Sequence, residues 1–191
     1  MLIDSHILNK VIYFLGDIIM ISWLRNSKVA MWVLTIARVY LGFQWVMDGF
    51  EKVTTKGDFD ASGMINMAIA KPVMTPAQTK AFPWYDWFLN LATNHGHATG
   101  FFSFAVAWGE LFVGLGLIFG TLTLAAAFFG MIMNFSYLGA GVVSVNPTFI
   151  FIEMFILMGG YNSARIGLDH WVTPFLRSKL PFLNNDIEIS K

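Results

Sequence analysis

The stretch from Phe101 to Phe119, FFSFAVAWGELFVGLGLIF, decides the fold class of this chain. Glu110 lies near its middle and is its only ionisable side chain. An apolar helix of roughly 20 residues, rising about 1.5 Å per residue, crosses the hydrocarbon core of a bilayer. A carboxylate at that depth costs several kcal/mol unless it is paired, protonated or facing a cavity. The stretch therefore predicts a membrane-spanning helix, and Glu110 is a candidate functional residue.

The composition of the whole chain also indicates an integral membrane protein. Of its 191 residues, 56% are hydrophobic and 13% are charged, and the mean hydropathy is +0.60. Soluble domains carry about 25% charged residues. The net charge is zero, which argues against a surface for nucleic acid. The lack of cysteine excludes disulfides, cysteine-ligated metals and thiol redox chemistry by this chain itself.

Four hydrophobic segments are expected to cross the membrane, at residues 29–50, 100–119, 122–142 and 148–166. Very short connections join the last three segments, so these helices are expected to be antiparallel neighbours. The sequence therefore predicts an all-α, polytopic membrane protein built as an antiparallel four-helix transmembrane bundle.

The segments before, between and after the four spans are expected to lie outside the bilayer. Residues 1–28 form an N-terminal cytoplasmic segment in which residues 7–24 are weakly hydrophobic; we expect an interfacial helix there, with a fifth span as the alternative. Residues 29–174 form the membrane domain, which includes a long external loop at residues 53–98. A short aromatic helix is expected to begin at Pro83 within this loop. Residues 175–191 form a cytoplasmic tail.

Basic residues predict the orientation in the membrane. Arg25 and Lys28 precede the first span, and Arg165, Arg177 and Lys179 follow the last. Loops rich in lysine and arginine stay on the cytoplasmic side. We therefore expect a multi-pass protein of the plasma membrane with both termini in the cytoplasm.

The predicted spans carry further polar residues besides Glu110. Counting about 1.5 Å per residue from the predicted span ends, Arg38 and Glu110 both lie roughly 13 Å above the cytoplasmic side. The count predicts an Arg38–Glu110 ion pair. It also predicts a second layer nearer the outside, formed by Gln44, Asn134 and Glu153.

Helical spacing places these polar residues on faces that also carry small residues. One stripe of the second span contains Ser103, Ala107, Glu110 and Gly114, and one stripe of the third contains Thr123, Ala127, Gly130, Asn134 and Gly141. Small residues beside polar ones are typical of close helix packing in lipid. We expect both stripes to face the interior of the bundle.

The charges of the interior suggest a role in proton transfer. Arg38 stays protonated and can neutralise one carboxylate, which by depth is that of Glu110. Glu153 is then left without a cation and is the expected proton donor or acceptor. The alternative is that Arg38, Glu110 and Glu153 only lock the helices together.

Aromatic residues near the acids suggest a site for a flat ring. Trp45, Trp108 and Tyr137, with Asn134, are the candidate ligand-binding residues, although packing against lipid or core is the favoured explanation for any one of the aromatic rings. The pair His95 and His97 lacks a third ligand, so no metal site is predicted.

Four sequence motifs, taken in order, resemble the DoxX/DoxD family of membrane proteins. They are Arg38-Val39-Tyr40-Leu41-Gly42 through Gly49-Phe50-Glu51-Lys52; Gly109-Glu110-Leu111 with Gly114, Gly116 and Gly120; Asn134-Phe135, Gly139-Ala140-Gly141 and Asn146-Pro147; and Gly160-Tyr161-Asn162-Ser163-Ala164-Arg165 with Gly167-Leu168-Asp169. The resemblance runs from about Val29 to Pro174. It implies a four-helix membrane protein and, for the DoxD-like branch, a small subunit of a thiosulfate:quinone oxidoreductase.

The first functional hypothesis is a membrane component of a quinone-linked oxidoreductase. In it Arg38 and Glu110 orient the bound molecule, Glu153 relays a proton, and electrons come from a substrate or a redox-enzyme partner. The second is a non-catalytic membrane anchor or assembly subunit for such a partner, with assembly into a homo-oligomer left open. The third is a small-solute or proton-coupled transporter, against which the lack of an internal inverted repeat counts.

Overall fold

The computed structural model describes residue 16, residues 19–54 and residues 58–180. Over these residues the chain is helical, with one isolated β-bridge between Met74 and Lys80. The helices that follow residues 19–26 are α2 (Lys28–Thr54), α3 (Ser62–Ala70), α4 (Pro83–Ala92), α5 (Gly100–Phe119), α6 (Thr123–Gly139), α7 (Asn146–Gly159), α8 (Tyr161–Ala164) and α9 (Asp169–Lys179). The prediction of an interfacial helix at residues 7–24 lies mostly outside the described residues.

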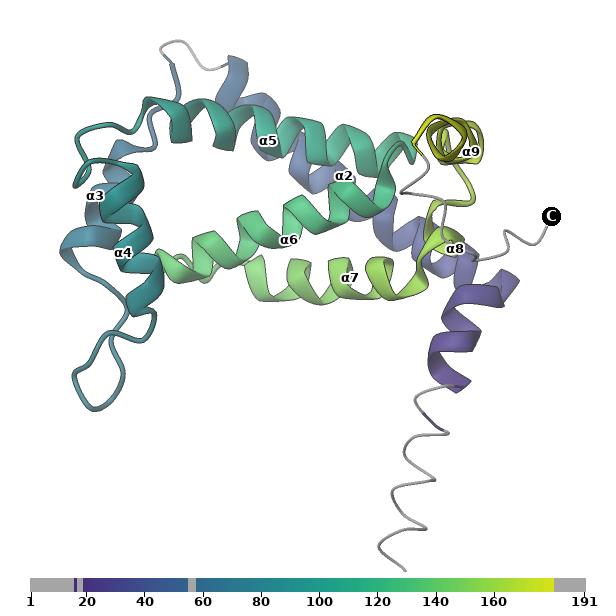
Figure 1. Ribbon diagram of the computed structural model, residues 1–191, viewed down its shortest axis with the longest axis horizontal. Helices are drawn as coiled ribbons and strands as arrows, with labels where there is room; N and C mark the ends of the chain where they lie inside the picture. The colour runs from purple at the N-terminus through teal and green to yellow at the C-terminus, as the bar shows by residue number, and fades with distance from the viewer. Residues whose placement is uncertain (1–15, 17–18, 55–57, 181–191) are drawn as a thin grey trace, which may run out of the picture.

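Helices α2, α5, α6 and α7 pack side by side along one direction (Figure 1). Helix α2 contacts α5 and α7, and α6 contacts the same two helices, so the four close around a common interior. Its apolar core includes Leu41, Val113, Leu117 and Ile156. The prediction of an all-helical chain is confirmed for the described residues.

Two of the four helices, α2 with 27 residues and α5 with 20, are long and apolar enough to cross a membrane. Helices α6 and α7, with 17 and 14 residues, are shorter than the predicted spans. Helix α6 ends at Gly139, before the predicted end at residue 142. Helix α7 stops at Gly159 because Gly160 takes a positive φ of 56°, a conformation outside the helical region.

Glycines bring α2 and α5 into close antiparallel contact. A Cβ atom added at Gly42 would lie 2.8 Å from the carbonyl oxygen of Gly114, and one added at Gly114 would lie 2.5 Å from the backbone nitrogen of Val46. Gly49 packs in the same way against the backbone of Leu111. Without side chains at these positions the two backbones approach each other directly, as small residues allow in membrane bundles.

The segment after α8 locks the tight turn between α5 and α6. Gly120 ends α5 in the left-handed conformation, with φ 64°. The Asp169 carboxylate accepts hydrogen bonds from the backbone N–H groups of Leu122 and Thr123, both at 2.8 Å. In the other direction, the Asp169 N–H donates to the Gly120 carbonyl at 2.6 Å. A carboxylate that is distant in the sequence thus caps the N-terminal end of α6, where a local N-cap side chain would otherwise accept these bonds.

Helices α3 and α4 lie at one end of the four-helix unit, and α8 and α9 lie at the other (Figure 1). The short aromatic helix expected at Pro83 is α4. Helix α9 begins at Asp169 and runs past residue 174, so the predicted start of the tail at residue 175 falls inside a helix.

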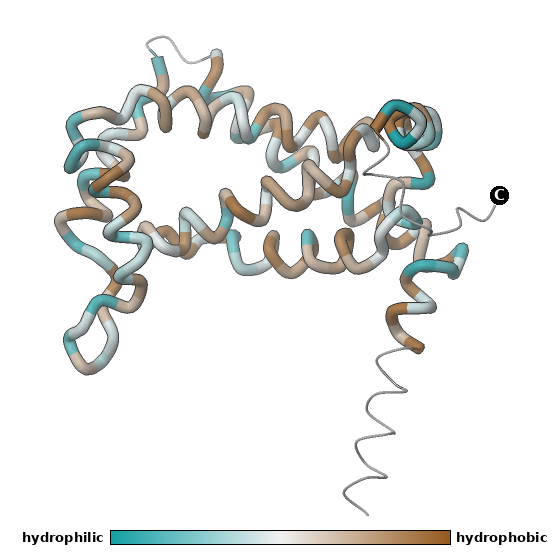
Figure 2. Tube along the Cα trace, viewed as in Figure 1, coloured by the Kyte–Doolittle hydropathy of each residue, from teal (hydrophilic) through white to brown (hydrophobic). Residues whose placement is uncertain are grey.

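Large apolar side chains cover the outward faces of the bundle, and Figure 2 shows hydrophobic residues along all four helices. The exposed ones include Trp32, Val33, Ile36, Val39, Tyr40, Phe43, Met47 and Phe50 on α2; Phe101, Phe104, Trp108, Phe112 and Phe119 on α5; and Phe128, Phe129, Ile132 and Phe135 on α6. Soluble monomers rarely expose this many large apolar side chains, so we expect these faces to contact an apolar environment.

Candidate functional site

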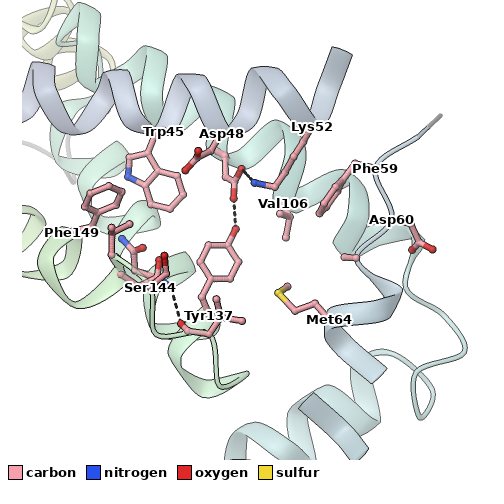
Figure 3. A pocket seen from close by; sticks show the side chains of 16 residues that line it. Trp45, Asp48, Lys52, Phe59, Asp60, Met64, Val106, Tyr137, Ser144 and Phe149 are labelled. Carbon is pink, nitrogen blue, oxygen red and sulfur yellow. Dashed lines mark hydrogen bonds and ion pairs between the residues drawn. The ribbon is translucent and has the colours of Figure 1, made fainter. Parts of the chain in front are cut away.

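A cavity of about 290 Å³ lies among α2, α5, α6 and α7, at the end of the bundle that carries α3 (Figure 3). The segment that leads into α3 contributes Phe59 and Asp60 to its wall, and α3 itself contributes Met64. The bundle contributes aromatic side chains, among them Trp45 and Phe149, whose ring centroids are 6.2 Å apart. The cavity therefore combines apolar walls with a few polar groups, which is typical of small-molecule sites.

The main polar cluster of the cavity is centred on Glu110. This side chain is 3% exposed, and its Oε2 atom accepts a hydrogen bond from the Lys52 ammonium at 2.5 Å. The Tyr137 hydroxyl donates to Oε1 at 2.6 Å. Three helices, α2, α5 and α6, each supply one member of this cluster. The buried carboxylate is thus paired with a cation and bonded at both oxygens, which offsets the cost of its burial.

A second polar cluster lies next to the cavity. Glu153 on α7 is fully buried, and both of its carboxylate oxygens accept from Nδ2 of Asn134, at 2.9 and 3.1 Å. The Trp45 indole N–H donates to Oε1 at 3.2 Å. Asn134 also lines the cavity, and its Oδ1 atom is buried without a hydrogen-bond partner in the part of the chain that the structure describes. This cluster therefore contains one acceptor that lacks a donor among the described residues.

The predicted contacts of Glu153 are confirmed in part. Asn134 bonds Glu153 as expected, but the α2 residue that reaches Glu153 is Trp45 and not Gln44. These two positions are adjacent on α2, so they face different directions by about 100°, the rotation per residue of an α-helix.

The predicted ion pair between Arg38 and Glu110 is wrong. The Arg38 guanidinium donates to the Ile166 carbonyl at 2.6 Å and to the Thr123 hydroxyl at 3.2 Å. It packs against Gly120, at the C-terminal end of α5. From Glu110 to that end the helix rises about 15 Å, so Arg38 and Glu110 lie too far apart along the bundle to form an ion pair.

The error lies in the assumed helix ends. The depth count treated the first two spans as ending at the same level on the cytoplasmic side. In the structure α2 has 27 residues and α5 has 20, and Arg38 lies level with the turn after α5. Helix α2 therefore continues beyond α5 at this end, which shifts every residue of α2 relative to the count.

The two predicted inward stripes are largely confirmed. Ala107, Glu110 and Gly114 of α5 are buried, as are Thr123, Ala127, Gly130 and Asn134 of α6. Ser103 is half-buried, and its hydroxyl accepts from the Ala61 N–H at 3.0 Å. Gly141 lies beyond the end of α6.

Trp108 does not belong to the cavity. Its side chain is 37% exposed and contacts the rings of Phe104 and Phe112 on the outer face of α5. Trp108 lies two positions before Glu110, which corresponds to a rotation of about 200° around the helix. The other candidates for ligand binding, Trp45, Asn134 and Tyr137, all line the cavity.

The sequence reasoning missed Lys52 and Asp48 as cavity residues. Lys52 was assigned to the polar flank after the first span. A helical spacing of three or four residues continues the inward stripe of α2 from Trp45 through Asp48 and Gly49 to Lys52. Both residues could have been predicted from the sequence by extending this inward stripe past the apolar segment.

No family model, curated protein or solved structure matches this chain. The resemblance to the DoxX/DoxD family stays a prediction, and the functional argument rests on the cavity.

Proposed function

We propose that the chain is an integral membrane protein in which α2, α5, α6 and α7 cross the bilayer as an antiparallel four-helix bundle. Two of these helices have the length and apolarity of spans, and large apolar side chains cover their outward faces. A fully buried glutamate and asparagine between α6 and α7 fit the same view, because polar groups in membrane bundles face the interior. The bilayer is then the partner of the outer surface.

We also propose that both termini are cytoplasmic and that the membrane is the plasma membrane. Helices α8 and α9 and the start of α2 lie at one end of the bundle (Figure 1). The basic residues Lys28, Arg177 and Lys179 belong to these elements, and lysine and arginine favour the cytoplasmic side.

Single cysteines test this orientation, since the chain has no native cysteine. Ala77→Cys, exposed between α3 and α4, is expected to react with an impermeant maleimide on intact cells. Ser178→Cys, exposed on α9, is expected to react only after permeabilisation. The reverse pattern contradicts the proposed orientation, and labelling of both on intact cells contradicts an even number of spans.

Within this bundle we propose a binding site for the ring of a quinone, which makes the protein a membrane component of a quinone-linked oxidoreductase. The observation that carries the proposal is the Lys52–Glu110–Tyr137 cluster inside an aromatic-walled cavity. The cavity volume of about 290 Å³ is near the lower end of small-molecule pockets, roughly 300–1,000 Å³. A flat ring with two polar edges suits these walls.

The residues of the cluster have distinct roles in this proposal. The Lys52 ammonium donates to a ring oxygen, and Trp45 and Phe149 pack against the ring faces. Glu110 and Tyr137 share a short hydrogen bond, through which a proton can pass to or from the ligand. A bound quinone supplies the two-electron redox chemistry, and the electrons are exchanged with a redox partner protein. Arg38 has no part in this site, because it lies at the other end of the bundle.

A photoreactive short-chain quinone tests the site in the purified full chain in lipid nanodiscs. We expect cross-links at the cavity residues Trp45 and Met64 that disappear with excess unreactive quinone. Lys52→Ala removes a charged donor and is expected to weaken this labelling about tenfold or more, as loss of 1.4 kcal/mol or more implies. The surface change Trp108→Phe is the matched control and is expected to leave the labelling unchanged.

The outcome also separates the other two hypotheses. Labelling confined to lipid-facing residues such as Trp108 and Phe112, without competition, contradicts a quinone site and favours a membrane anchor. A non-catalytic anchor is also favoured if Lys52→Ala labels as strongly as the unchanged chain. Accumulation of a solute in proteoliposomes, coupled to a proton gradient, favours a transporter.

A further inference from the structure

We infer that the cavity selects an uncharged ring that carries O–H groups, such as the quinol form of a quinone, and rejects anionic ligands. The inference rests on the proposed function and specifies which ligands the same site accepts. It follows from the charges and the hydrogen-bonding groups that line the cavity.

Among the described residues that line the cavity, carboxylates outnumber cations. Lys52 is the cation among these described residues, and the carboxylates are Asp48, Asp60 and Glu110. The Lys52–Glu110 contact at 2.5 Å neutralises one carboxylate. Asp48 and Asp60 are exposed and remain as two separate negative charges of the cavity wall. Protonation of Glu110 makes the summed charge of these four residues less negative by one unit, and the sum stays negative.

Asp60 is held in its ionised form. Its carboxylate accepts from the Ser62 hydroxyl at 2.6 Å and from the Ser62 N–H at 2.8 Å. These hydrogen bonds stabilise the charged form and hold the pKa of Asp60 below its ordinary value. At neutral pH an approaching anion therefore meets a fixed negative charge at this edge of the cavity.

The hydrogen-bonding groups also favour a ligand that donates. Tyr137 directs its hydroxyl at Glu110, and Lys52 directs one of its three ammonium donors there, so Lys52 can still donate to a ligand. The carboxylates of Asp48 and Asp60 can only accept when ionised. Asn134, at the inner wall, directs its N–H groups at Glu153 and leaves its Oδ1 atom without a partner among the described residues. A ligand hydroxyl can accept from Lys52 and also donate to an acceptor such as Asn134 Oδ1 or Asp48, whereas a carbonyl can only accept, so a hydroxyl fits these groups better.

One consequence concerns the substrate that the DoxD resemblance implies. Thiosulfate is a dianion, and at this cavity it would face Asp48 and Asp60. The cavity is then the site of the quinol, and the oxidation of any small anion belongs to a partner protein.

Three redox-stable ligands test the selectivity: an alkylresorcinol with two O–H groups, its dimethyl ether, and an alkylbenzene sulfonate. Affinities are measured by competition with the photoreactive quinone on the full chain in nanodiscs. We expect the resorcinol to bind about tenfold more tightly than the ether, since the ether leaves an acceptor unpaired. We expect no competition from the sulfonate.

Charge removal tests the origin of the anion exclusion. The double variant Asp48→Asn with Asp60→Asn keeps the size of both side chains and is expected to admit the sulfonate. Asp58→Asn, which removes an exposed charge outside the cavity wall, is the matched control and is expected to exclude it still. Circular dichroism and size-exclusion profiles of the variants check that each is folded.

The possible failures are distinguishable. Equal affinity for the resorcinol and its ether, or sulfonate binding to the unchanged chain, contradicts the selectivity while the ring site stands. Exclusion of the sulfonate that persists in the double variant contradicts the role of Asp48 and Asp60. Lack of competition by all three ligands, together with unspecific labelling by the quinone, contradicts the proposed function itself.

Discussion

Asp169→Ala is expected to lower the free energy of unfolding by about 3 kcal/mol, because it removes the acceptor of one buried and one partly buried backbone N–H group, and a buried one costs about 1–3 kcal/mol when left unsatisfied. Asp169 is 2% exposed and caps the start of α6 through Leu122 and Thr123. Its charge also faces the buried Arg38, which donates to the hydroxyl of the same Thr123. The variant thus leaves two donors and a cation without their anion.

The measurement is reversible unfolding of the purified protein in mixed micelles with increasing sodium dodecyl sulfate. His170→Ala, at the exposed neighbouring position, is the matched control and is expected to change the stability by less than about 0.5 kcal/mol. Asp169→Asn retains one carbonyl acceptor and is expected to fall between the two. Equal stability of Asp169→Ala and His170→Ala would contradict the capping role.

The same cluster changes the meaning of the family resemblance. Arg38, Gly120 and Asp169 come from three different motifs, and the structure brings all three to one turn. Their contacts hold helix ends together and include no cavity residue. These three motif residues therefore support the fold, whereas the proposed chemistry depends on two other motif residues, Lys52 and Glu110, and on Tyr137.

The sequence was informative about which side chains face the interior. Helical periodicity fixes the direction of each side chain relative to its own helix, so Glu110, Asn134 and Glu153 were assigned correctly to buried faces. The interior position of these residues needed no knowledge of the neighbouring helices.

The sequence was less informative about which interior residues meet. The partner of Glu110 depends on the level of α2 relative to α5, and this level is set by close backbone packing along Gly42, Gly49 and Gly114. Periodicity carries no information on such a shift along the axis. The ends of helices are also poorly marked in an apolar stretch, so Lys52 was taken as a flank although it lies in the last turn of α2.

The glycine contact between α2 and α5 therefore has a measurable consequence for both stability and the site. Gly114→Ala is expected to destabilise the protein by about 3 kcal/mol, at the upper end of the cost of overpacking. The added Cβ atom would lie 2.5 Å from the Val46 backbone nitrogen and 2.7 Å from the Gly42 carbonyl oxygen. These are backbone atoms, so a side-chain rotation cannot relieve the contact and the two helices have to separate.

Gly100→Ala on the same helix is the matched control, because a Cβ atom there has nothing within 4 Å. Alanine favours helix over glycine by up to about 1 kcal/mol, so this variant is expected to be neutral or slightly stabilised in the same unfolding assay. Separation of α2 from α5 also moves Lys52 away from Glu110, and we expect Gly114→Ala to lose quinone labelling while Gly100→Ala retains it. If Gly114→Ala matches Gly100→Ala in both stability and labelling, the direct backbone packing of α2 on α5 is contradicted, and with it the register that pairs Lys52 with Glu110.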